Sequence, residues 1–160
     1  MTADEQPREE RDTAGVIAPP PLIFLAFLLL GYVVESVMPD NNLPSALQWL
    51  GALLIVLGIA LGVAFERALS QARTPANPYR KTERLATTGA FSFSRNPGYL
   101  AMTIVYVGLS LAADAPWALL FLIPALLVIH YGVIVREERY LERLFGDEYR
   151  SYKGRTRRWI

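Results

Sequence analysis

Four long runs of apolar residues dominate the hydrophobic pattern of this chain. They cover about residues 21–38, 46–65, 97–113 and 116–135. Each run has roughly 17–20 residues, which is enough for a helix rising about 1.5 Å per residue to cross a hydrocarbon core of about 30 Å. The pattern therefore predicts an all-α protein with four transmembrane helices.

A buried bundle in a soluble protein is the alternative explanation of these runs. Soluble helices carry a polar stripe at a spacing of 3.6 residues, and the run 46–65 has almost none. Glu35 is the single charge within the four runs, whereas each mid-span charge would cost about 2.5–3.5 kcal/mol on insertion. Membrane insertion is therefore favoured, and Gly51, Gly58 and Gly62 are predicted to form a helix-packing face.

The basic residues predict how the helices are oriented. Loops 39–45 and 114–115 contain no Lys or Arg, and all 16 basic residues lie in segments 1–20, 66–96 and 136–160. With four spans these three segments fall on one side, which the positive-inside rule makes cytoplasmic. We expect an integral, multi-pass membrane protein with both termini in the cytoplasm, in the plasma or inner membrane if the source is a bacterium.

The same pattern suggests how the chain is divided. Residues 1–20 are polar and charged before a run of prolines, and we interpret them as a disordered or loosely attached cytoplasmic tail. Residues 21–160 are predicted to form a single membrane domain. Its fourth span continues into the charged segment after residue 135, which predicts a cytoplasmic helical extension stopping near Gly146.

Composition argues against several kinds of site. The chain has no cysteine, so disulfides and thiolate metal sites are excluded. A single histidine, His130, argues against a multi-histidine metal site. The net charge of +1 lacks the basic excess typical of nucleic-acid binding. We therefore expect no metal and no nucleic-acid partner, and the sequence leaves the oligomeric state open.

Two polar segments next to the third and fourth runs carry candidate chemistry. The third run opens at Arg95 and Asn96, where a helix start presents free N–H groups to an anion. Glu137 and Glu138 follow the fourth run and lack good local partners at helical spacing. His130 lies two turns before Glu137, so both are expected to face one groove.

The basic and aromatic segment from Tyr149 to Ile160 has a composition typical of the membrane interface. We expect it to lie against lipid headgroups.

These residues match a known family. The stretch 83–100, which contains Arg95-Asn96-Pro97-Gly98-Tyr99, is followed by a helical hairpin, by Glu137-Glu138 and by Phe145-Gly146-Asp147-Glu148-Tyr149. This order resembles the isoprenylcysteine carboxyl methyltransferase family and is similar to that of the phospholipid N-methyltransferases. The resemblance covers about residues 74–160. It implies a transmembrane enzyme that binds S-adenosylmethionine in a cytosol-facing pocket closed by the C-terminal segment.

The resemblance also implies which residues contact the cofactor. They are Glu83, Arg84, Leu85, Ala86, Phe91, Asn96, Pro97, Gly98, Tyr99 and Glu137. Arg95 and Glu138 are candidate catalytic residues, together with His130, the one ordinary base for an acceptor that must lose a proton.

Two positions depart from the family pattern. Asn96 stands where many members have histidine, and Val133 stands where the eukaryotic enzymes have an acceptor-binding arginine. The expected function is methylation of a lipophilic acceptor, either isoprenylcysteine carboxylate-like or another lipid or small molecule.

Two other functions are compatible with the same sequence. Sterol-reductase-like proteins share a similar arginine–histidine–proline–x–tyrosine element, so an NADPH-dependent membrane reductase is one alternative. A non-enzymatic scaffold or small transporter is the other. Transporters usually show broken spans or repeated halves, and the chain has neither pattern.

Overall fold

The regular secondary structure of this chain is helical throughout the part that the structure describes. The structure is a computed structural model, and it describes residues 13–39, 43–75 and 82–160. Within these ranges there is no strand, as the sequence predicts. The elements are α2 (Pro20–Val37), α3 (Ser45–Ala72), the 3₁₀-helix η1 (Gly89–Ser92), α4 (Pro97–Ala112), α5 (Pro116–Ile129), the π-helix η2 (His130–Ile134), α6 (Val135–Phe145) and α7 (Asp147–Arg155).

Among the described residues, three helices are long and apolar enough to cross a membrane. They are α2, α3 and the continuous helix Pro116–Phe145, which joins α5, η2 and α6. α4 is a shorter apolar helix. Proline stands in the first turn of α2, α4 and α5, where a missing N–H costs little. The chain is therefore an integral membrane protein, and the count of four spans stays a prediction.

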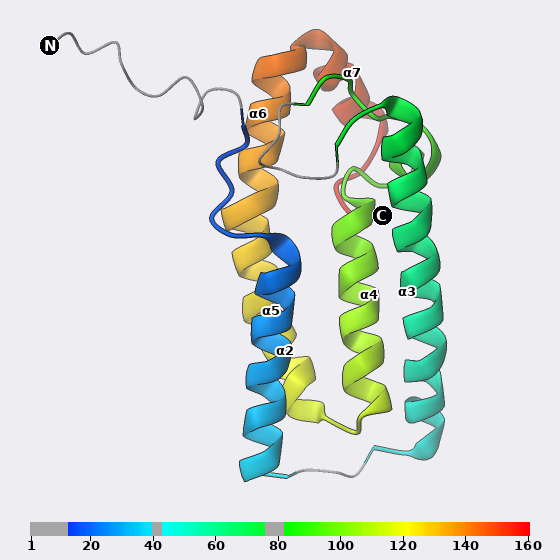
Figure 1. Cartoon of the computed structure of the whole chain (residues 1–160), viewed down its shortest axis with the longest axis vertical. Coiled ribbons are helices and arrows are strands. Elements are labelled where there is room, and N and C mark those ends of the chain that lie inside the picture. Colours follow the sequence, from blue (N-terminus) through cyan, green and yellow to red (C-terminus); the bar gives the residue numbers. More distant parts are fainter. Residues whose placement is uncertain (1–12, 40–42, 76–81) are drawn as a thin grey trace, which may run out of the picture.

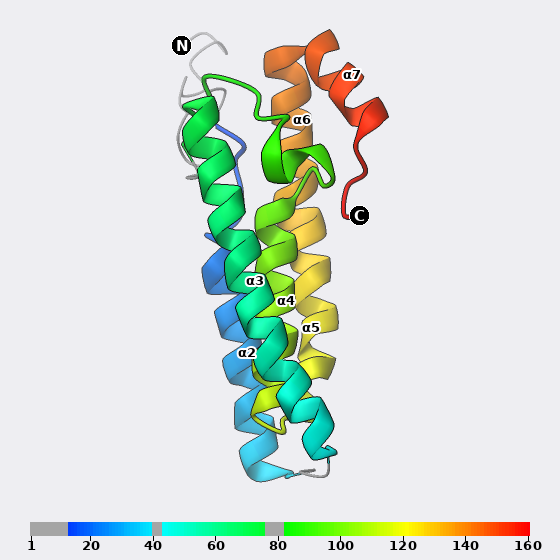
Figure 2. The same cartoon turned by 90° about the vertical axis from the view of Figure 1, so that its right-hand side faces the viewer.

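The apolar helices form two closely packed pairs. α3 lies along α4, and α2 lies along α5 (Figures 1 and 2). Glycine permits the first contact, because a Cβ added at Gly51 would lie 2.5 Å from the backbone nitrogen of Ala112. In the second pair, a Cβ added at Gly31 would lie 2.4 Å from the Cα of Ala118. The predicted packing role of Gly51 is confirmed.

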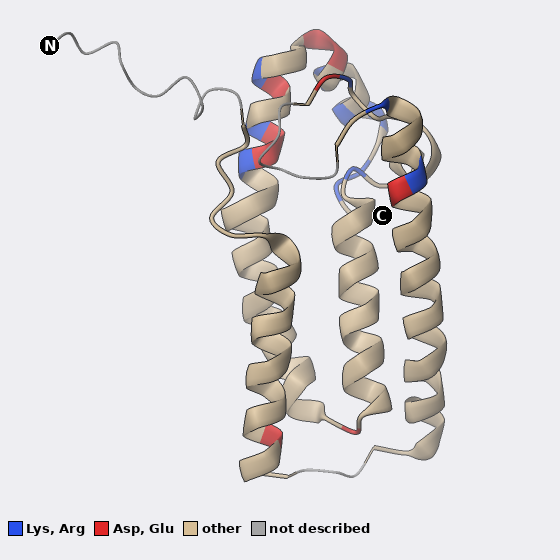
Figure 3. Ribbon diagram, in the orientation of Figure 1, with Lys and Arg blue, Asp and Glu red and all other residues tan. Residues whose placement is uncertain are grey.

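The two ends of the bundle differ in charge. Lys and Arg gather at the end where α6 and α7 lie, and the opposite end carries acidic positions only, within the part of the chain described (Figure 3). We call the first the charged end. Helix α7 folds back beside α6 there, and the chain after it returns toward the start of α4 (Figures 1 and 2). The fold therefore gathers the polar segments at a single end.

The N-terminal segment before α2 packs on the bundle. Val16 is 7% exposed and belongs to the apolar core with Val133 and Ile134. The Ile17 N–H donates to the carbonyl of Gly132 at 3.3 Å. We call residues 13–19 the N-terminal strap. The second half of the predicted loose tail is thus attached to the bundle, whereas residues 1–12 lie outside the described residues.

Candidate functional site

A pocket of about 570 Å³ opens at the charged end of the bundle. We call it the charged-end pocket. Most of the predicted site residues line it. They are Arg84, Leu85, Ala86, Phe91, Arg95, Asn96, Pro97, Gly98, Tyr99, Glu137 and Glu138. The start of α4 and the start of α6 therefore face one shared space, although about 40 residues separate them in the sequence.

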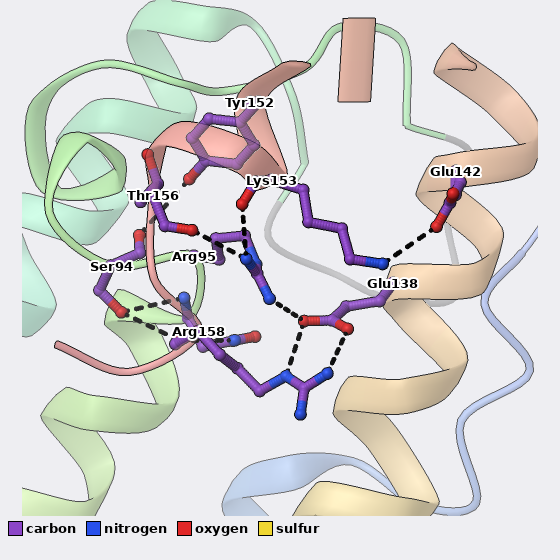
Figure 4. A network of polar contacts seen from close by, with 9 residues as sticks. Ser94, Arg95, Glu138, Glu142, Tyr152, Lys153, Thr156 and Arg158 are labelled. Atoms are coloured by element: carbon purple, nitrogen blue, oxygen red, sulfur yellow. Dashed lines mark hydrogen bonds and ion pairs between the residues drawn. The ribbon is translucent and has the colours of Figure 1, made fainter. Parts of the chain in front are cut away.

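A cluster of ion pairs joins three segments at the pocket wall (Figure 4). Glu138 of α6 accepts hydrogen bonds from Arg95 Nη2 at 3.0 Å and from Arg158 Nε and Nη2 at 2.9 and 2.8 Å. The Arg95 and Glu138 side chains are each 10% exposed. Bidentate pairing of guanidinium and carboxylate is among the strongest side-chain interactions. Glu138 thus ties the start of α4 to the C-terminal segment.

The C-terminal segment closes over the loop that precedes α4. The Arg95 N–H donates to the carbonyl of Arg157 at 2.9 Å, and Asn96 Nδ2 donates to the carbonyl of Arg158 at 2.9 Å. Arg95 Nη1 donates to the carbonyl of Thr156 at 2.8 Å (Figure 4). These contacts join residues about 60 positions apart in the sequence. The C-terminal segment is therefore an integral part of the pocket wall.

The expectation that this segment lies against headgroups is wrong for its aromatic residues. Tyr149 is 1% exposed and Tyr152 is 4% exposed, and both line the charged-end pocket. The Tyr152 hydroxyl donates to the carbonyl of Phe91 at 2.7 Å. Tyr149 and Tyr152 are three residues apart on α7, so one face of that helix carries both, and that face turns inward.

Glu137 has a different environment from its neighbour. Its Oε1 accepts a hydrogen bond from the Tyr99 hydroxyl at 2.8 Å. Glu137 lies on α6, beyond the apolar run 116–135. Desolvation in the pocket wall raises the pKa of Glu137 to about 7, with a further raising effect of Glu138 and a lowering one of the Tyr99 hydrogen bond. Such a carboxyl is poised to change charge when a cation binds.

The pKa of Glu138 shifts in the opposite direction. Burial raises the pKa of its carboxyl, but the hydrogen bonds and charges of Arg158 and Arg95 outweigh burial, and the pKa is lowered. Glu138 is therefore a permanent carboxylate at neutral pH. Most polar atoms of Arg95 are engaged within the chain, whereas its buried Nε has no hydrogen-bond partner among the described residues.

Two predicted residues do not line the pocket. Glu83 and His130 are absent from its described lining, although Arg84 and Glu137 beside them are present. His130 begins the π-helix η2, and its ring contacts Tyr131 edge-on, with 4.8 Å between ring centroids. A π-helix has wider turns than an α-helix. The two-turn spacing that was expected to align His130 with Glu137 therefore does not hold.

Several lining residues were not predicted from the sequence. They include Phe65, Glu66, Met102, Tyr140, Tyr149, Tyr152 and, from the N-terminal side, Ala14 and Pro19–Pro21. Arg158 was also missed as the partner of Glu138. A signal existed for Arg158, because two carboxylates without local partners require a cation from elsewhere, but the sequence offered several arginines and no way to choose among them.

A second, largely apolar groove adjoins the pocket. It has a volume of about 430 Å³ and is lined by residues of α2, α3 and α4. It shares Pro21, Phe65, Glu66, Gly98 and Met102 with the charged-end pocket. Of the described residues that line this groove, Glu66 alone is charged. The groove therefore leads from the apolar middle of the bundle to the polar site.

The site lacks the features of a metal centre. Residues 13–39, 43–75 and 82–160 contain no cluster of three or more His, Asp or Glu side chains that could hold a metal ion. The pocket instead combines a carboxyl of raised pKa, an unpartnered guanidinium nitrogen and several aromatic side chains. That combination suits an organic ligand with positive charge and a flat ring.

Comparison with known proteins gives a family and one relative. Residues 46–148 match the sequence model of the family described as phospholipid methyltransferase. An uncharacterized protein of Haemophilus influenzae is 44% identical over 62 residues, which are 39% of this chain and 98% of that protein. No solved structure matches the chain. The matched region contains α4, η2 and the glutamate pair of α6, together with most of the pocket.

Proposed function

Because this chain belongs to the phospholipid methyltransferase family, we propose that it is a membrane enzyme that methylates a lipophilic acceptor with S-adenosylmethionine. The observation that carries the proposal is that the Asn96–Tyr99 motif, Glu137 and the C-terminal segment line one pocket. The volume of about 570 Å³ lies within the usual range for pockets that take a small molecule or cofactor.

The residues of the pocket fit the methyl donor. When bound, the donor supplies an electrophilic methyl group carried on a sulfonium. Glu137 is suited to its ammonium or ribose hydroxyls, and the Arg95 guanidinium, which lines the pocket, is suited to its carboxylate. Phe91 and Tyr149 offer aromatic surface for adenine. Glu138 acts mainly as a positioning residue, because it holds the Arg95 guanidinium in place.

The apolar groove supports a lipophilic acceptor. It opens among helices that cross the membrane and joins the charged-end pocket at five shared residues. An acyl or prenyl tail can move from the bilayer into this groove without leaving an apolar medium, and close packing holds it there. The reacting end then lies beside the donor, and the chain contributes positioning and exclusion of water. The donor enters from the charged end and the acceptor from the bilayer.

Glu66 indicates which kind of reacting group the acceptor carries. It is exposed at the junction of groove and pocket, and no described residue pairs with it. A carboxylate at this point attracts an amine and repels a carboxylate acceptor. Val133 also leaves the chain without the arginine that the resemblance associates with a carboxylate acceptor. We therefore favour an amine-bearing lipid as the substrate class.

The membrane arrangement is part of the same proposal. α4 counts as a fourth span, the charged end faces the cytoplasm, and both termini lie there. Residues 21–160 act as one membrane domain, and residues 74–160 contribute most of the donor site. In this arrangement the basic end of the bundle lies at the inner leaflet, so the pocket opens toward the cytoplasm and a water-soluble donor can reach it directly.

Calorimetry on the purified protein in detergent tests the function. We expect binding heat with S-adenosylmethionine and none with NADPH. Binding of NADPH alone would support the reductase alternative, and binding of neither would support a scaffold or transporter. Neither alternative is favoured by the family match. Incubation of membranes with methyl-labelled donor, followed by identification of the labelled lipid, then identifies the acceptor.

A further inference from the structure

The N-terminal strap forms part of the charged-end pocket. Ala14 and Pro19 line the pocket together with Pro20 and Pro21 at the start of α2. The strap lies outside residues 46–148, the region that matches the family. It runs along the outside of the continuous α5–α6 helix before α2 begins (Figure 1). This wall of the pocket is thus supplied by a segment that the family match does not include.

Hydrogen bonds and apolar contacts hold the strap. The Ile17 N–H donates to the Gly132 carbonyl at 3.3 Å, and Arg136 Nη1 donates to the Gly15 carbonyl at 2.8 Å. Val16 is buried in the core beside Val133. The anchors come from η2 and α6, the segments that lead into Glu137. Strap and glutamate are therefore attached to the same stretch of helix.

The contact at Gly132 has little tolerance for change. A Cβ added there would lie 2.4 Å from Ile17 Cδ1 and 2.9 Å from Ile17 Cγ1, and the three nearest atoms all belong to the Ile17 side chain. Ile17 is 53% exposed, so its side chain can move outward. A methyl group at position 132 therefore acts on the strap through the Ile17 side chain, and the reactivity of a thiol at position 14 reports whether the strap moves.

We propose that the N-terminal strap is a binding element of the donor site, which holds the methyl donor by covering one wall of the charged-end pocket. This inference rests on the proposed function. The strap contributes two apolar residues, Ala14 and Pro19, to the pocket lining, so its role is to exclude water and lipid headgroups. Exclusion of water strengthens the electrostatic contacts that Glu137 and Arg95 make inside the pocket.

Three variants test the proposal by calorimetry with S-adenosylmethionine. Gly132→Ala should weaken binding about tenfold. Adding Ile17→Ala to Gly132→Ala should restore most of the affinity, since it removes the atoms that the new methyl group meets. Gly154→Ala is the matched control, because an added Cβ at Gly154 has nothing within 4 Å. Its affinity should equal that of the wild type.

A second measurement does not depend on any ligand. The chain has no cysteine, so Ala14→Cys introduces a single thiol at the pocket wall. Its reaction with a water-soluble maleimide should be slower than that of Ser151→Cys, an exposed site on α7. Gly132→Ala should accelerate the reaction at position 14 and leave the reaction at position 151 unchanged.

The outcomes separate the two proposals. Unchanged donor affinity in Gly132→Ala, with a faster reaction at position 14, would overturn the role of the strap. So would a loss of affinity that Ile17→Ala fails to restore. If the wild type binds no donor, the proposed function fails. The maleimide reaction then tests the strap without any ligand. Equal reaction rates at positions 14 and 151 would show that the strap does not form a wall of the pocket.

Discussion

Glu137 and Glu138 are adjacent in the chain, yet their surroundings move their pKa values in opposite directions. Desolvation raises the pKa of Glu137 to about 7, whereas two arginines lower that of Glu138 against the effect of burial. Adjacent helix positions point about 100° apart, so one carboxyl faces the pocket beside Tyr99 and the other faces the arginines. Their roles differ accordingly: Glu137 is suited to ligand binding and Glu138 to holding the fold.

The raised pKa of Glu137 predicts pH-dependent donor binding. The carboxyl is mostly protonated at pH 6 and mostly ionised at pH 8, so affinity for a cationic donor should rise by up to about tenfold over this interval. Glu138 stays ionised throughout, because its pKa is lowered. Glu137→Gln cannot ionise and should remove most of the rise when calorimetric titrations are repeated at each pH. Parallel pH profiles for the two proteins would contradict the assignment.

The ion cluster predicts a large effect of Glu138→Gln on stability. Removing the carboxylate leaves Arg95 buried without its partner, which should cost about 3 kcal/mol. Glu142→Gln, one turn further along α6, breaks an exposed pair with Lys153 and should change stability by less than about 1 kcal/mol. Thermal unfolding in detergent compares the two. Because the folded-state pKa of Glu138 is lowered, its stabilising effect is present at neutral pH and is lost as the pH falls through that lowered value.

At the scale of elements, the packing of α3 against α4 shapes the apolar groove beside the site. The glycines of α3 were predicted to form one packing face, and the structure distinguishes between them. Gly51 and Gly58 meet backbone atoms of α4 closely, whereas a Cβ added at Gly62 would be 3.9 Å from the nearest atom. Gly58 and Gly62 both line the apolar groove. The same sequence signal therefore marks close helix packing at Gly51 and Gly58 and open space beside the helix at Gly62.

This difference predicts opposite results for alanine at two positions of α3. Gly51→Ala forces the helices apart, because its Cβ would lie 2.5 Å from the Ala112 nitrogen and 2.7 Å from the Gly108 oxygen. Overpacking of this kind should cost about 1–3 kcal/mol. Gly62→Ala should be neutral or stabilising, by up to about 1 kcal/mol, because alanine favours a helix. Thermal unfolding measures both, and equal losses at the two sites would contradict the assignment.

At the scale of the whole molecule, the asymmetry of charge predicts the orientation in the membrane. The described basic residues gather at the end that holds the pocket (Figure 3). Single cysteines introduced by Trp49→Cys and Ser151→Cys lie at opposite ends of the bundle and report on its two sides. In intact cells, a membrane-impermeant maleimide should label the first and not the second, and permeabilised cells should show both. Labelling at position 151 in intact cells would reverse the proposed orientation.

The sequence by itself determined the all-helical class, the apolar segments and the family, since these depend on local composition, periodicity and short motifs. It also brought forward Asn96 and Glu137, because polar residues beside apolar runs are visible without coordinates, and the family resemblance added Tyr99. Only the tertiary structure decided that Arg158 pairs with Glu138, that Tyr149 and Tyr152 turn inward, and that residues of the N-terminal strap line the pocket. These contacts join segments about 20 to 120 residues apart, and one-dimensional spacing carries no information on which of several similar side chains will meet. The π-helix η2 adds a local reason, because its wider turns shift His130 away from the direction that regular helical spacing implies.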